Sequence, residues 1–149
     1  MIDGVVIVPL KRIPDERGSV QHMLKRTDPH FQEFGEIYFS TIYPGVVKGW
    51  HLHSRMTINY SCIVGNIKLV CYDERPTSKT KGEVQVIYLG QKSPVLVSVP
   101  PGVWNGFMNV DVVESIVANC ATIAHDPTEV TRLDPHQNHI PYDWKRKDG

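Results

Sequence analysis

The sequence has no excess of either charge, because its 16 lysines and arginines are balanced by 16 aspartates and glutamates. A neutral chain lacks the electrostatic footprint of a protein that binds nucleic acid or an anionic membrane surface. No apolar run approaches the roughly 20 residues that cross a bilayer, and the first residues lack the basic and apolar regions of a secretion signal. We therefore expect no nucleic-acid and no membrane partner, and any anionic ligand would be bound by a few local cations.

Cysteine is scarce as well, with only Cys62, Cys71 and Cys120 present. The number is odd and each cysteine lies in an apolar, strand-like run, which is typical of buried free thiols rather than of a disulfide framework. Free thiols persist in reducing compartments, so we expect a cytoplasmic location.

What the sequence does have is a repeated alternation of apolar and polar residues, broken at short intervals by turn residues. Gly65-Asn66, between two such runs, predicts a tight hairpin turn, and only residues 27–34 resemble a short helix. No linker or repeat interrupts residues 1–149, so many short strands in one domain predict an all-β sandwich or barrel. The runs rich in Val, Ile and Tyr that we predict as strands are 4–10, 19–25, 36–43, 46–52, 57–64, 66–73, 83–89, 95–99 and 112–118.

Two histidines, His51 and His53, lie two residues apart in one predicted strand. Side chains at i and i+2 of a strand share a face, so both imidazoles point the same way. Their neighbours Trp50 and Leu52 and a preceding valine run favour the interior of the barrel over solvent. A pair of hydrogen-bonded structural histidines is the alternative.

A second segment, residues 99–109, contains two prolines and a glycine that predict a rigid turn aiming Trp104 or Asn105 back at the sheet. Together the two segments resemble the paired motifs of the cupin superfamily. The resemblance implies an all-β cupin or jelly-roll barrel with short helical segments and a polar pocket in the barrel mouth. Asn105 stands where metal-binding cupins carry a histidine, and no glutamate follows His53. Two histidines are too few for a tight divalent site, so we expect no metal and no other cofactor.

The chain resembles the metal-free dTDP-4-dehydrorhamnose 3,5-epimerase family more closely, over nearly its whole length. Residues 15–18 match the family's D-x-R-G, and residues 45–51 match G-V-L-R-G-L-H with lysine in place of arginine. Residues 64–75 match its V-G-x-(strand)-D-x-R, residues 100–107 match I-P-x-G-x-A-H-G-F, and residues 133–144 match the terminal W-N-D-P and I-x-W. Five motifs in the right order predict both the fold and the place of the pocket.

The resemblance implies an isomerase or epimerase that acts on a nucleotide-linked 4-keto-deoxysugar. His51 would remove a proton next to the carbonyl, and Asp134 would orient it and raise its pKa toward the working pH. Arg17 and Lys48 would neutralise the diphosphate. For Asp134 a turn cap before Pro135 is the alternative, and for Arg17 a solvated turn charge. The other residues that we expect to bind substrate are His53, Arg55, Trp104 and Asn105.

Two family residues have no counterpart here. The lysine that holds the enolate oxygen falls at a gap before Ile58, with Arg55 the nearest cation, and the tyrosine acid falls at about Val117. The resemblance therefore implies an atypical epimerase, with Tyr60, Tyr72 or a pocket water as substitute acids. A sugar-nucleotide 3,4-ketoisomerase, whose family also carries H-x-H and a P-x-V-W turn, is one alternative. A non-catalytic protein that binds sugar nucleotides is the other.

We also expect a homodimer. The open end of a small barrel leaves edge strands that invite pairing, and the family that the chain resembles exchanges N-terminal strands between subunits.

Overall fold

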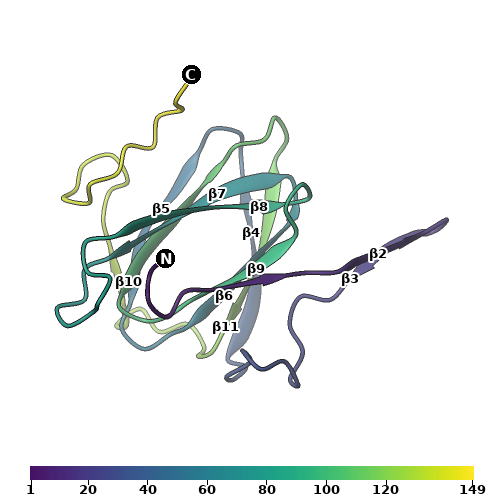
Figure 1. The fold of residues 1–149 in the computed structure, drawn as a ribbon, viewed down its shortest axis with the longest axis horizontal. Helices are drawn as coiled ribbons and strands as arrows, with labels where there is room; N and C mark the ends of the chain where they lie inside the picture. The colour runs from purple at the N-terminus through teal and green to yellow at the C-terminus, as the bar shows by residue number, and fades with distance from the viewer.

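The computed structural model describes residues 1–149 as twelve strands and no helix (Figure 1). With no helix present, there is none that could cross a bilayer. The strands are β1 (Val6–Pro9), β2 (Arg12–Asp15), β3 (Gly18–Gln21), β4 (Glu36–Ile42), β5 (Val47–His53), β6 (Ile58–Val64), β7 (Asn66–Asp73), β8 (Val84–Gly90), β9 (Val95–Val99), β10 (Val103–Asn109), β11 (Ser115–Ala121) and β12 (Val130–Arg132).

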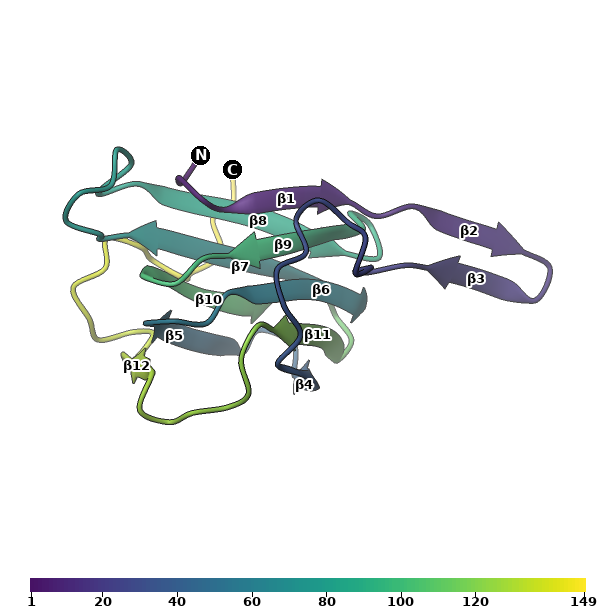
Figure 2. The same cartoon turned by 90° about the horizontal axis from the view of Figure 1, so that it is seen from below.

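Two five-stranded antiparallel sheets form the barrel. The first has the order β1-β9-β6-β11-β4 and the second the order β12-β5-β10-β7-β8. The remaining pair, β2 and β3, is a separate hairpin that extends beyond the end of the barrel in both views (Figures 1 and 2). This architecture confirms the predicted all-β jelly roll.

The core fills the space between the two sheets, as the alternation of apolar residues requires. It is a cluster of 18 buried residues that includes Leu69, Val97 and Val99, each 0% exposed. The three cysteines are free and buried, as predicted from their surroundings.

The predicted short helix over 27–34 is wrong. That segment forms isolated turns, in which Asp28 N–H bonds to the Lys25 carbonyl at 3.0 Å and Phe31 N–H to the Asp28 carbonyl at 3.0 Å. Pro29 has no N–H to donate to a helical ladder, and the Asp28 carboxylate accepts the Lys25 N–H at 2.7 Å in a local cap.

The predicted hairpin at Gly65-Asn66 is also wrong, although the tight turn is there. Strands β6 and β7 belong to different sheets, so the turn carries the chain from one layer to the other. Gly65 has φ +75°, in the left-handed region that favours glycine.

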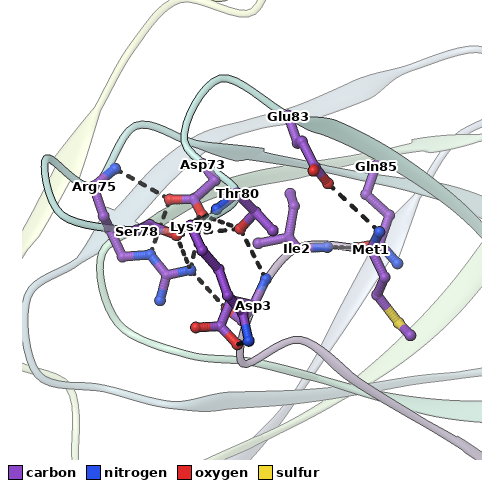
Figure 3. A network of polar contacts seen from close by, with 10 residues as sticks. All are labelled: Met1, Ile2, Asp3, Asp73, Arg75, Ser78, Lys79, Thr80, Glu83 and Gln85. Atoms are coloured by element: carbon purple, nitrogen blue, oxygen red, sulfur yellow. Dashed lines mark hydrogen bonds and ion pairs between the residues drawn. The ribbon is translucent and has the colours of Figure 1, made fainter.

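A buried polar network fixes the N-terminal residues to the loop after β7 (Figure 3). At its centre lies Asp73, 0% exposed, which accepts hydrogen bonds from Arg75, Ser78 and Thr80 at 2.6–2.9 Å. The Arg75 guanidinium holds the pKa of Asp73 well below its usual range. Arg75 also donates to the Asp3 carbonyl at 2.6 Å, so the network joins segments more than 70 residues apart.

Candidate active site in the barrel mouth

A cavity of about 200 Å³ opens between the two sheets near the end of β5. It is lined by Glu36, Tyr38 and Ser40 of β4, Lys48, His51 and His53 of β5, Tyr60 of β6, Phe107 of β10, Asn119 of β11, Val130 and Arg132 of β12, and Met56 and His125 from the connections.

Both histidines of β5 face this cavity, as the i, i+2 spacing predicts. The alternate residues of the strand face the other way. Trp50, 0% exposed, and Leu52 pack outside the sheet in a second cluster with Trp144 of the C-terminal segment. The C-terminal segment therefore buries the outer face of β5, while the inner face carries the polar groups.

Strand β10 lies beside β5 and supplies a rear wall. Gly49 and Gly106 lie so close that a Cβ on Gly49 would be 2.9 Å from the Gly106 Cα, so glycine is required for this approach. Asn105, the register partner of His51, is 1% exposed. Its Oδ1 accepts the Tyr60 hydroxyl at 2.7 Å, so Asn105 positions Tyr60 and is not itself a lining residue.

His53 is held in place by a buried carboxylate. Its Nδ1 hydrogen-bonds to Glu129, which is 4% exposed. Burial alone would raise the pKa of Glu129, but the hydrogen bond from His53 and those from the backbone N–H groups of Arg55 and Met56 lower it on balance. The carboxylate is therefore ionised at neutral pH, and it fixes both His53 and the turn after β5.

His51 has no hydrogen-bonded side-chain partner of this kind. The nearest strand, β12, places Arg132 directly opposite it in register, and side chains at such positions share a face. Burial, then the charge of Arg132, then that of His53 lower the pKa of His51 to about 4. His51 is therefore a neutral imidazole at physiological pH, with a free ring nitrogen available as a proton acceptor.

The predicted pairing of His51 with Asp134 is not present. Asp134 is exposed, and its Oδ1 accepts the backbone N–H groups of His136 at 2.7 Å and Gln137 at 3.0 Å. This is the turn cap that the sequence left open as an alternative. The pKa of His51 is therefore lowered rather than raised, because burial and the charge of Arg132 act on it and no carboxylate lies beside it.

Three further predicted residues lie outside the cavity lining. Trp104 is 5% exposed on the outer side of β10, where its indole N–H donates to Glu74 at 2.8 Å. Arg55 points to solvent and pairs with Asp126 at 2.8 Å. Arg17 lies at the turn of the projecting hairpin, 85% exposed and paired with Asp15 at 2.6 Å.

Lys48 does line the cavity, and its Nζ donates to the Thr41 carbonyl at 2.6 Å. Sequence reasoning missed several other lining residues, among them Tyr38 and Arg132. It also missed Glu129, the buried partner of His53. The only local signal was in β4, where polar residues alternate with Ile37 and Phe39.

A larger hollow, about 690 Å³, lies outside the barrel against the C-terminal segment. Its lining includes the cations Lys68, Lys145 and Lys147 but no histidine. Proton transfer near neutral pH is best served by histidine, so the smaller cavity inside the barrel is the candidate active site. No cluster of three or more His, Cys, Asp or Glu side chains is arranged to hold a metal ion anywhere in the chain.

Comparison with known proteins identifies the family of this chain. The model of the dTDP-4-dehydrorhamnose 3,5-epimerase family matches residues 1–148. The chain belongs to this family. Membership makes it a sugar-nucleotide epimerase or isomerase with the family's jelly-roll fold.

Individual relatives of the family cover nearly the whole chain. The spore coat polysaccharide biosynthesis protein SpsL of Bacillus subtilis is 32% identical over 143 residues, which are 96% of this chain and 91% of that protein. The probable low-salt glycan biosynthesis epimerase Agl13 of Haloferax volcanii is 30% identical over 144 residues, covering 95% and 89%. The crystal structure of a dTDP sugar isomerase from Desulfovibrio desulfuricans is 39% identical with a TM-score of 0.95, covering 99% and 94%.

Proposed function

We propose that this enzyme epimerises a nucleotide-linked 4-keto-deoxysugar, and that His51 removes the proton from a carbon next to the carbonyl. One observation carries the proposal: a neutral imidazole without a side-chain partner faces a cavity between the sheets, beside an arginine.

His51 is in the protonation state that a general base needs. A base must be unprotonated before it acts, and an imidazole whose pKa is about 4 is almost wholly neutral at pH 7. The adjacent His53 is the rival base. Its Nδ1 is already engaged by the ionised Glu129, whereas the ring of His51 has no side-chain hydrogen-bond partner. We therefore propose that His53 binds substrate rather than accepting the proton.

Arg132 supplies the positive charge that the chain lacks at the position of the family's lysine. Proton removal sends the electron pair of the C–H bond to the carbonyl oxygen, which becomes an enolate. A guanidinium near that oxygen stabilises the developing negative charge. Arg132 forms none of the ion pairs in the structure and lines the cavity on the same side as His51. Lys48, which also lines the cavity, would bind the diphosphate as a point charge.

The names of relatives support a proposal for the substrate class. The Desulfovibrio desulfuricans protein is named a dTDP sugar isomerase. A dTDP-6-deoxy-D-glucose 3,5-epimerase from Legionella pneumophila, 23% identical with a TM-score of 0.79, is described in complex with dTDP-4-keto-L-rhamnose. We propose a nucleoside diphosphate-linked 4-keto-6-deoxysugar for this chain as well.

The test is a proton NMR time course in deuterated buffer with a panel of thymidine, uridine and guanosine diphosphate-linked 4-keto sugars. We expect deuterium to enter next to the carbonyl and the carbonyl to remain at carbon 4. A carbonyl that moves to carbon 3 would support the ketoisomerase alternative. Thermal stabilisation by a sugar nucleotide without any exchange would instead support the non-catalytic binding protein.

A further inference from the structure

Epimerisation needs two groups, because the proton must leave one face of the sugar ring and return to the other. His51 lies on β5 of one sheet, and the cavity in front of it is closed by β4 of the facing sheet. An acid that completes inversion is therefore expected on β4, β6 or β11. Val117 of β11, at the place of the family's tyrosine, cannot donate a proton.

Two tyrosines line the cavity, Tyr38 of β4 and Tyr60 of β6. The proton of Tyr60 is already committed, because its hydroxyl donates to Asn105 at 2.7 Å and the residue is only 4% exposed. Tyr72, the third candidate from the sequence, packs in the cluster outside the second sheet and does not reach the cavity. Tyr38 remains.

The setting of Tyr38 suits a proton donor. Glu36, Tyr38 and Ser40 alternate along β4 and all line the cavity. No hydrogen bond engages the Tyr38 hydroxyl, and the residue is 43% exposed, so water can restore its proton. Burial and the charge of Glu36 raise the pKa of Tyr38, while Arg132 partly opposes them, so the phenol is protonated at neutral pH.

Arg132 affects side chains on both of the facing sheets. Its charge lowers the pKa values of both His51 and Tyr38, so the guanidinium lies within electrostatic reach of each. All three side chains line the same cavity.

We propose that Tyr38 is the catalytic acid that reprotonates the sugar from the face opposite His51; this rests on the proposed function. The C–H bond breaks, its proton goes to His51, and its electron pair forms the enolate at Arg132. The enolate then collapses, its carbon takes the proton of the Tyr38 hydroxyl on the other face, and a tyrosinate remains. Water returns a proton to Tyr38 and removes one from His51, so the reaction is a net isomerisation with no co-reactant.

Tyr38→Phe tests this assignment, because it removes the hydroxyl proton and leaves the ring. In deuterated buffer with the accepted 4-keto sugar nucleotide, we expect label to enter with retained configuration within a few-fold of the wild-type rate. The epimer should accumulate roughly 10²- to 10⁴-fold more slowly, the usual cost of losing a general acid. Tyr43→Phe is the matched control, since Tyr43 follows the same strand but is 69% exposed outside the cavity.

Three outcomes are decisive. Wild-type inversion by Tyr38→Phe would overturn the assignment while leaving the proposed function intact. Loss of inversion in Tyr60→Phe but not in Tyr38→Phe would transfer the role to Tyr60. Absence of exchange in the unaltered enzyme with the whole panel would overturn the proposed function itself and Tyr38 with it. Melting temperatures of all variants show whether a loss reflects unfolding.

Discussion

The lowered pKa of His51 gives a quantitative prediction for the pH dependence of proton abstraction. Its folded-state pKa is about 4, below the usual 6.5, because of burial and the charge of Arg132. Only the neutral imidazole accepts a proton, so activity is full above this pKa and is lost as the pH falls through it. At pH 5 a base of pKa 4 is about 90% neutral and one of pKa 6.5 about 3%, a difference of roughly thirtyfold.

The assay is the rate of solvent deuterium entry at low substrate concentration, measured from pH 4 to pH 8, since kcat/KM reports ionisations of the free enzyme. We expect a flat profile from pH 6 to pH 8 and an acid limb near pH 4. Replacing Arg132 by Gln should move that limb to higher pH, because one of the two main causes of the shift is removed. An acid limb near 6.5 or above in the wild type would refute the reasoning. Circular dichroism at each pH separates loss of activity from unfolding.

Three other predictions follow from the fold. Asp73→Asn should cost about 3–5 kcal/mol, since it leaves the partly buried Arg75 without its carboxylate (Figure 3). At roughly 2–4 °C per kcal/mol the melting temperature should fall by about 6–20 °C, whereas Asp15→Asn on the exposed hairpin should leave it unchanged. Sedimentation should show a homodimer, because an isolated hairpin is marginally stable and Ile13 and Val20 are 48% and 57% exposed on it; a monomer at micromolar concentration would contradict this. Elemental analysis of protein purified without chelator should find no stoichiometric zinc, iron or nickel, and close to one equivalent would reverse the expectation.

The parts of the site that sequence predicted are those set by local periodicity. Alternation along β5 places His51 and His53 on one face and Trp50 and Leu52 on the other, and no distant contact is needed to know this. Most strands were predicted for the same reason, but β2, β10 and β12 were not. Strand β10 was read only as a turn, because its prolines and glycine conceal the short alternating run that follows.

The parts that sequence missed depend on register between distant segments. Arg132 is opposite His51 only because β12 pairs with β5, and Glu129 reaches His53 across 76 residues of chain. No sequence pattern in the loop-rich tail predicts these contacts. Asp134, which lies in a matched family motif, was therefore predicted as the carboxylate partner of the histidine instead of Glu129. Strand β4 has its pattern inverted, with Ile37 and Phe39 49% and 59% exposed and polar residues inside. An interpretation that places apolar residues in the core overlooks Tyr38 for that reason.

The central claim is that His51 is the base, and the most direct test compares His51→Gln with His53→Gln by deuterium exchange into the accepted 4-keto sugar nucleotide. Both changes remove one imidazole from the same face of β5, so each is the control for the other. We expect His51→Gln to slow exchange by roughly 10²- to 10⁴-fold, the usual contribution of a general base, while thermal shifts with thymidine diphosphate show that binding persists. His53→Gln should weaken binding more than it slows exchange at saturation. Loss of exchange in His53→Gln together with normal exchange in His51→Gln would contradict the account.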